Sequence, residues 1–98
     1  MRQYRINGHL ECDDRYVYAI CDDALVAVHG TTEEEALGRI QEAAVVYVSG
    51  LRRLGWIGAA IKAGRIRAET VTGAGLPAAP ASVERVGSSF SLVVATAR

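Results

Sequence analysis

This sequence has no excess of charge of either sign, since its 98 residues include 11 Lys and Arg and 11 Asp and Glu. A balanced chain has no overall field that draws it toward nucleic acid or an anionic membrane. Long hydrophobic runs are missing too, and no uncharged apolar stretch approaches the roughly 20 residues of a membrane span. The N-terminus lacks the continuous apolar segment of a signal peptide. We therefore expect a cytoplasmic protein with no membrane partner.

Cysteine and histidine are also scarce, with two of each in the chain. Two cysteines in a cytosolic protein are usually buried thiols. A structural zinc ion needs about four ligands, and only His9 and His29 could join Cys12 and Cys21. The glycine-containing stretches match neither a phosphate loop nor a dinucleotide fingerprint. We therefore expect no metal site and no cofactor.

The first thirty residues have the pattern of β-strands. Half of the residues are hydrophobic, which suffices for one core in a chain of this length. Residues 3–12 alternate loosely between polar and apolar side chains, residues 15–21 are rich in aromatic and β-branched residues, and residues 24–29 are expected to form a third strand. The Asp pairs at 13–14 and 22–23 suit tight turns. The sequence therefore predicts a three-stranded antiparallel meander.

Two-residue loops at the Asp pairs predict a register in which Val17 lies opposite Leu10 and Val28. This register divides the meander into two faces. The core face holds Tyr4, Ile6, Leu10, Val17, Ala19, Cys21, Val26 and Val28. The second face holds Arg5, Asn7, His9, Glu11, Tyr16, Tyr18, Ile20, Leu25, Ala27 and His29. The centre of the second face is too apolar for an ordinary solvated surface.

The capping residues and the apolar spacing of residues 32–54 predict one long helix packed on the core face. Thr32 can cap the first turn while Glu35 answers from the third position, as in a capping box, and Gly55 supplies a stop. Apolar residues recur at helical spacing along one side. This stripe consists of Leu37, Ile40, Ala44, Tyr47, Val48, Leu51 and Leu54. Val45 and Val46 widen it, which indicates a broad buried face or, alternatively, a dimer contact.

Beyond the helix the pattern predicts four further segments. They are a short helix at 57–63, a strand at 65–72, a loop at 73–82 and a strand at 89–96. The expected fold is α+β, with the meander, the long helix on the sheet and one or two C-terminal strands, βββαβ in outline. Residues 1–98 then make a single domain, with a core at 3–55 and an extension at 56–98.

Three chemical interpretations compete with structural roles. His9 and His29 could share acid–base chemistry, but no nucleophile is expected beside them. The turn aspartates could hold a cation, but the topology puts the two pairs at opposite ends of the middle strand. Residues 56–67 combine a short helix, a glycine and a basic strand, a loose likeness to the end of an excisionase-type DNA-binding unit. We favour the structural roles and expect no catalytic residues and no enzyme.

A motif joins the meander to the helix. Residues 30–36 read Gly-Thr-Thr-Glu-Glu-Glu-Ala, a glycine that leaves a strand followed by a capping box. Ile40, Glu42-Ala43, Tyr47, Leu51 and Gly55 follow along the helix. The stretch from Arg15 to Gly55 thereby resembles the HicB-like antitoxin family, in which a short meander leads through Gly-x-Thr-x-Glu-Glu-Ala into a long helix. It departs by lacking the Pro-x-Leu-Pro-Gly turn and a recognisable DNA-binding domain after the helix.

The resemblance implies a degenerate RNase H-like layer without catalytic residues. It also implies a partner, a HicA-type toxin. Such a toxin is a small basic protein that cleaves messenger RNA, and the antitoxin binds it directly and blocks its catalytic histidine. Because the DNA-binding domain is missing, we expect weak duplex DNA binding or none. Two alternatives stay open, an orphan binding or structural module with this fold and a small DNA-binding regulator.

The second face of the meander is the expected partner surface, because aromatic residues with polar tips are favoured at interfaces. Its expected contact residues are His9, Tyr16, Tyr18, Ile20, Leu25 and His29. One helix cannot cover both faces of a sheet. Either the C-terminal strand folds over the second face or another chain does. We favour another chain, a toxin or a second copy, and expect a homo-oligomer, dimeric or larger.

Overall fold

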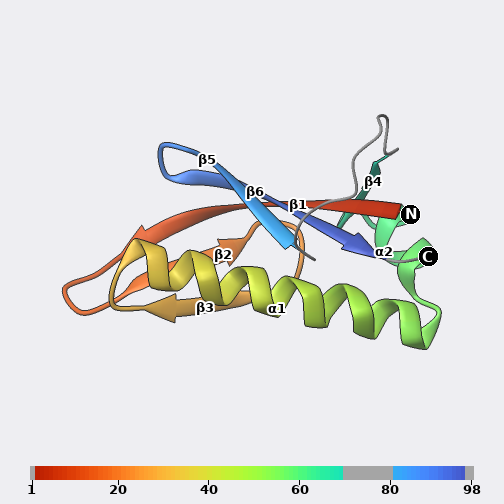
Figure 1. The fold of residues 1–98 in the computed structure, drawn as a ribbon, viewed down its shortest axis with the longest axis horizontal. Helices are drawn as coiled ribbons and strands as arrows, with labels where there is room; N and C mark the ends of the chain where they lie inside the picture. Colours follow the sequence, from red (N-terminus) through yellow and green to blue (C-terminus); the bar gives the residue numbers. More distant parts are fainter. Residues whose placement is uncertain (1, 70–80, 97–98) are drawn as a thin grey trace.

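The computed structural model describes residues 2–69 and 81–96. Its elements are β1 (Arg2–Cys12), β2 (Val17–Cys21), β3 (Ala27–Gly30), α1 (Glu33–Leu54), α2 (Ile57–Lys62), β4 (Arg67–Glu69), β5 (Ala81–Val86) and β6 (Ser89–Thr96). The strands form one six-stranded sheet in the order β3-β2-β1-β6-β5, with β4 also paired to β1 (Figure 1). The α+β class and the meander before one long helix are confirmed.

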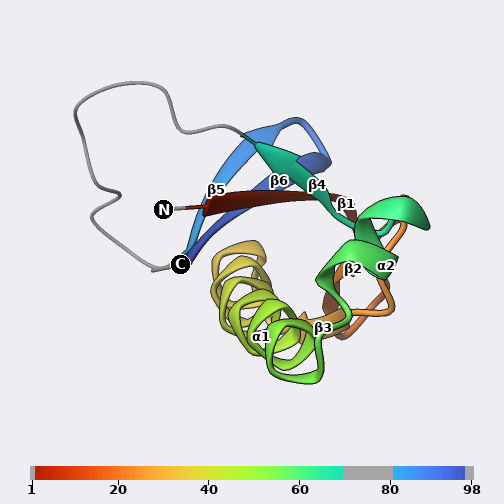
Figure 2. The same cartoon turned by 90° about the vertical axis from the view of Figure 1, so that its right-hand side faces the viewer.

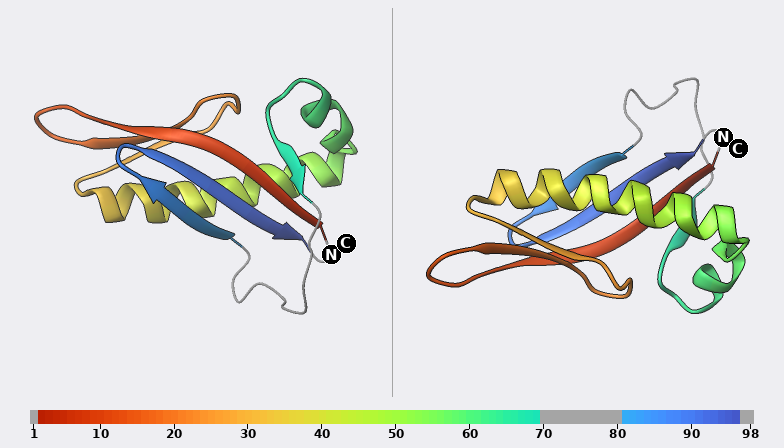
Figure 3. Two further views of the ribbon diagram at one scale, coloured as in Figure 1. Left: turned by 90° about the horizontal axis from the view of Figure 1, so that it is seen from above. Right: turned by 90° about the horizontal axis from the view of Figure 1, so that it is seen from below.

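Strand β1 is the centre of the sheet. One edge of β1 pairs with β6 from Arg2 to His9. Its other edge is shared end to end, by β4 at residues 3–5 and by β2 at residues 8–12. All of these pairings are antiparallel. The C-terminal strand β6 therefore widens the sheet by pairing beside β1 and does not fold over the meander (Figure 3).

The expected register was wrong by two residues in both hairpins. Val17 lies opposite Cys12 and Gly30, in place of Leu10 and Val28. The first turn is longer because Asp13 accepts hydrogen bonds from the backbone N–H groups of Arg15 and Tyr16, which holds the chain in the turn as far as Tyr16. A shift of two leaves every side chain on its expected face, because side chains alternate with a period of two.

The expected core face is confirmed. Four of its side chains are buried, and the rest are partly buried against them. The buried ones are Tyr4, Ile6, Ala19 and Cys21, and the others are Leu10, Val17, Val26 and Val28. Burial raises the pKa of the Cys21 thiol to about 11. Cys12, at the end of β1, is exposed, so the expectation of two buried thiols was wrong for that residue.

Helix α1 begins and ends as its sequence predicts. The Thr32 hydroxyl accepts a hydrogen bond from the Glu35 N–H at 3.1 Å, and the Glu35 carboxylate accepts one from the Thr31 N–H at 3.2 Å. Gly55 ends the helix with φ +73°, a left-handed conformation that glycine adopts without a steric penalty. Ala36, Ile40, Ala44 and Val48 are its buried residues.

The expected stripe of α1 was wrong at Leu54, which is 59% exposed. A helix turns by about 100° per residue, so Leu54 lies about 120° around the axis from Val48 and away from the sheet. Val46 is also exposed, at 72%, so the broad buried face does not extend to it. Leu37, Val45, Tyr47 and Leu51 pack partly buried against the core.

The C-terminal expectations are mixed. The short helix is confirmed as α2 and the last strand as β6. Of the strand expected at 65–72, the structure has Arg67–Glu69, while residues 70–72 lie outside the described residues, as do 73–80 of the expected loop. Residues 81 and 82 belong to β5, an edge strand that the sequence did not predict. Its composition, Ala-Ser-Val-Glu-Arg-Val, is too polar to stand out as a strand.

Changing Gly8 to Ala should destabilise the protein. A Cβ atom there would lie 2.4 Å from the Ile20 carbonyl oxygen and 2.4 Å from the rim of the Phe90 ring. Because Gly8 sits between β2 and β6, either the backbone or the ring must move, and we expect a loss of about 1–3 kcal/mol in unfolding free energy. Urea unfolding followed by circular dichroism measures it.

The control is Gly58→Ala on α2, where a Cβ atom meets nothing within 4 Å. That variant should be neutral or slightly more stable, since Ala exceeds Gly in helix propensity by up to about 1 kcal/mol. Equal unfolding midpoints for the two variants would contradict the close packing at Gly8.

Candidate functional site

The face of the sheet opposite α1 is open. Figure 2 shows α1 along one side of the sheet, and the left view of Figure 3 looks onto the other side, with the helix behind the strands. We call this other side the open sheet face. Its side chains include Arg5, Asn7, His9 and Glu11 of β1, Tyr18 and Ile20 of β2, Ala27 and His29 of β3, Arg67 and Glu69 of β4, Glu84 of β5, and Ser89, Ser91 and Val93 of β6. None of them is buried.

Three aromatic rings gather at one corner of the open sheet face. Tyr18 lies opposite His29 in the ladder, and Tyr16 stands just before β2. The ring centroids of Tyr16 and His29 are 4.9 Å apart, and Tyr18 lies 6.3 Å from each of the other two. These edge-to-face and tilted arrangements are favourable between aromatic rings. We call Tyr16, Tyr18 and His29 the aromatic cluster.

Asp13 holds the aromatic cluster in place. One carboxylate oxygen accepts the backbone N–H groups of Arg15 and Tyr16, and the other accepts the Tyr18 hydroxyl at 2.8 Å. The backbone bond from Arg15, followed by that from Tyr16, lowers the pKa of Asp13. The bond to Asp13 raises the pKa of the Tyr18 phenol. The first turn therefore fixes a negative charge beside exposed aromatic rings.

His9 is anchored separately, in the middle of β1. Its Nδ1 lies 2.5 Å from an Asp22 oxygen and its Nε2 lies 3.5 Å from a Glu11 oxygen. The hydrogen bond to Asp22 raises the pKa of His9 above its ordinary value of 6.5. In the ladder, His9 faces Ile20 of β2 on one side and Ser89 of β6 on the other.

The expected contact residues are thus only partly brought together. Tyr16, Tyr18 and His29 form the cluster, and His9 and Ile20 face each other next to it along β1 and β2. Leu25 is apart from them. It lies in the turn before β3, at the far end of β2 from Tyr16, and is 83% exposed. His9 and His29 lie on strands separated by β2.

Two residues that position this site were not predicted from the sequence. Asp13 and Asp22 were assigned to turns, and the structure has them bind Tyr18 and His9 as well. Asp13 and Tyr18 are five residues apart across the first turn, so their contact is local, whereas Asp22 is 13 residues from His9. The partner of the Arg5 guanidinium, Glu69 of β4, carried no such signal because it is 64 residues away in the chain.

Replacing Asp22 with Asn should lower the pKa of His9 toward 6.5. The pKa of His9 is higher in the folded protein than in the unfolded chain. The protonated imidazole therefore stabilises the fold fully below about pH 6.5, and this contribution is lost as the pH rises through the raised pKa. The C–H proton resonances of the two histidines, followed by NMR against pH, measure the change.

Asp23→Asn removes the same charge one residue away and serves as the control, with no expected effect on the His9 titration. A His9 midpoint at 6.5 in the wild-type protein, or one that Asp22→Asn leaves unchanged, would contradict the hydrogen bond.

Comparison of the chain with protein-family models, with curated proteins and with solved structures finds no match in any of the three. Within residues 2–69 and 81–96, no group of three or more His, Cys, Asp and Glu side chains is placed to hold a metal ion. None of the described helices combines the length and apolar character that crossing a membrane requires.

Proposed function

We propose that this chain is an antitoxin-type binding protein without catalytic activity, and that it neutralises a HicA-type toxin by direct contact through the open sheet face. The observation that carries the proposal is the exposed aromatic cluster with a fixed carboxylate at its edge. The likeness of residues 15–55 to HicB-like antitoxins supports it, as does the meander that leads through a capped turn into one long helix.

Charge favours a basic partner at this end of the molecule. The turn between β1 and β2 and the first turn of α1 lie together at one end (Figure 1). We call this the hairpin end, and six of the eleven acidic residues belong to it. They are Glu11, Asp13, Asp14, Glu33, Glu34 and Glu35. Arg15 lies in the same turn, and Arg39 and Arg85 pair with Glu35 and Glu33, so part of this charge is offset. The remaining negative charge speeds the encounter with a small basic toxin and orients it.

The aromatic cluster would then provide the close contact. Tyrosine rings offer a large contact area and lose little side-chain entropy on binding, because only two torsions are fixed. Tyr18 is already held by Asp13, which reduces the ordering cost further. A toxin docked here is blocked because the antitoxin covers its catalytic histidine, as the resemblance implies. The residues of this chain bind the toxin and cover its active site, and they catalyse no reaction themselves.

A second copy of the chain is the alternative occupant of the open sheet face. The observation that favours it is the same exposed cluster, since aromatic residues with polar tips are enriched in interfaces of both kinds. The two occupants differ in a measurable way. A homodimer through this face forms without any toxin and depends on protein concentration.

We expect the double variant Tyr16→Ala with Tyr18→Ala to lose neutralisation. The test co-expresses the chain with the protein encoded by a short basic reading frame beside its gene, and follows growth and cleavage of messenger RNA. Wild type should restore growth and bind the toxin. The double variant should bind at least ten times more weakly, because it removes two central aromatic contacts.

The matched control is Trp56→Ala, which removes an exposed aromatic residue from the opposite end of α1 and should neutralise like wild type. A neighbouring protein that the wild-type chain neither binds nor neutralises would refute the antitoxin proposal. Dissociation of a toxin-free dimer by the double variant would assign the face to a second copy.

A further inference from the structure

Ion pairs sort the basic side chains of the described chain into two groups. Arg5, Arg39 and Arg85 each bind a carboxylate. Among residues 2–69 and 81–96, the others form no ion pair, and they are Arg2, Arg15, Arg52, Arg53, Lys62, Arg65 and Arg67. All of these except Arg15 lie at the start of β1, in the last turn of α1, in α2, just before β4 or at its first residue. These segments lie at one end of the molecule (Figure 1).

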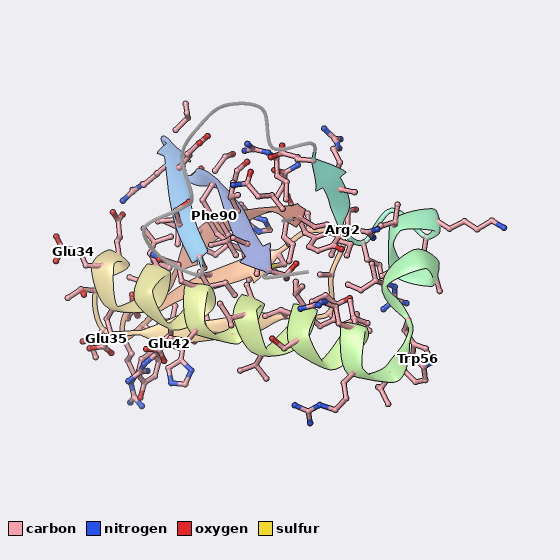
Figure 4. The ribbon with its side chains drawn as sticks, turned by 45° about the vertical axis from the view of Figure 1, so that its right-hand side comes forward. Arg2, Glu34, Glu35, Glu42, Trp56 and Phe90 are labelled. Carbon is pink, nitrogen blue, oxygen red and sulfur yellow. The ribbon has the colours of Figure 1, made fainter. Side chains whose placement is uncertain are left out.

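This end is opposite to the hairpin end. Helix α1 has 22 residues, so the two ends are about 33 Å apart at 1.5 Å per residue. Figure 4 shows Glu34 and Trp56 at the two ends of α1. A net charge of zero therefore hides a strong separation of charge. Unpaired cations gathered at one end repel each other, and binding an anion would relieve that repulsion.

An exposed tryptophan lies between the unpaired cations in the sequence and shares a cavity with one of them, Arg65. Trp56 follows the Gly55 cap, at the corner where the chain turns from α1 into α2, and is 57% exposed. It lies in sequence between Arg52 and Arg53 on one side and Lys62 and Arg65 on the other. We call these residues, with Arg67, the α1–α2 corner. Beside the indole is a cavity of about 490 Å³, lined by Tyr47, Leu51, Trp56, Ala59, Ala60, Ala63 and Arg65.

The helix dipole explains only part of this arrangement. Arg52 and Arg53 in the last turn of α1 interact favourably with its C-terminal carbonyl groups. The dipole of α1 gives no reason for Arg65 and Arg67, which come after α2. It also gives no reason to expose a large apolar ring among the charges. A ligand that is both anionic and flat would satisfy the cations and the ring together.

We propose that the α1–α2 corner binds single-stranded nucleic acid, with a base stacked on Trp56 over the apolar cavity and phosphates beside the arginines. Stacking on an aromatic side chain within a basic surface is the way such strands are held without sequence preference. A duplex is a poorer fit. Reading a major groove needs a free helix or two-stranded ribbon, but α2 has six residues and α1 is buried along the sheet.

The proposal is independent of the toxin site. The aromatic cluster lies beside the turn at the hairpin end, whereas Figure 4 shows Trp56 at the other end of α1, so a toxin centred on the cluster leaves Trp56 accessible. Asp23 shares a second cavity with Arg65 and Arg67 and partly offsets their charge. The strongest phosphate contacts are therefore expected at Arg52 and Arg53, next to Trp56.

The experiment uses the fluorescence of Trp56, the only tryptophan of the chain. The probe is a twelve-nucleotide uridylate RNA with a fluorescein label for anisotropy. We expect it to quench Trp56 and to bind with an affinity that falls with salt, since each neutralised phosphate contributes about −0.7 to the slope of log K against log salt. Contact with about three phosphates predicts a slope near −2.

Matched variants locate the site. The double variant Arg52→Gln with Arg53→Gln should bind the RNA at least tenfold more weakly. Arg15→Gln removes an unpaired arginine at the hairpin end and should bind like wild type. In anisotropy, Trp56→Ala should lose about tenfold and Trp56→Phe should recover most of it, because stacking needs a ring. Thermal unfolding shows that each variant is folded.

Several results would overturn the proposal. Absence of both quenching and binding at 50 mM salt would reject an RNA site. A twelve-base-pair duplex that binds more tightly than the single strand would assign the corner to duplexes. Polyglutamate that competes as well as the RNA, with no dependence on Trp56, would indicate an acidic protein partner. Equal losses in Arg15→Gln and in the Arg52/Arg53 double variant would show that the binding is not local.

Discussion

The pairing of β1 with three other strands is the constraint on which the rest of this structure depends. Strand β1 has 11 residues and pairs with β6 along one edge and with both β4 and β2 along the other. Alternation along β1 then fixes both surfaces of the sheet at once. Tyr4 and Ile6 point into the core under α1, while Arg5, Asn7 and His9 point to the open sheet face. Gly8 allows β2 and Phe90 to approach where any side chain would collide.

Polar contacts across distant strands complete this frame. On the open sheet face, the Arg5 guanidinium binds Glu69 of β4 and Glu84 of β5, and Ser91 donates a hydrogen bond to Asn7 at 2.6 Å. On the other side, Arg85 of β5 reaches Glu33 at the start of α1, and Arg39 of α1 donates to the His29 carbonyl. Within the described residues, these contacts leave the rings of the aromatic cluster and the indole of the α1–α2 corner at least partly exposed.

Local sequence patterns predicted the elements that depend on neighbours in the chain. The capping box at Thr32 and Glu35 works within one turn, and the two Asp-rich turns set which face each residue of the meander takes. For the candidate site, the expected face was right for Tyr18 and His29, which share a corner of the open sheet face with Tyr16, but the expected grouping with Leu25 was wrong because Leu25 lies at the other end of β2. The β5–β6 hairpin was missed, although Gly87-Ser88 is a favoured two-residue turn and has φ +61° at Gly87.

By itself the sequence determined the meander, the long capped helix and the division of side chains between two faces, because period and capping act over a few residues. Only the tertiary structure decided the register, the neighbours of β1 and the surfaces that result. Asp13 lengthens its turn and moves the pairing by two residues, a choice that hydrophobic alternation cannot distinguish. The basic residues between Arg2 and Arg67 are far apart in the sequence. They lie at one end of the molecule because α1 runs back toward the start of β1, where β4 pairs with residues 3–5.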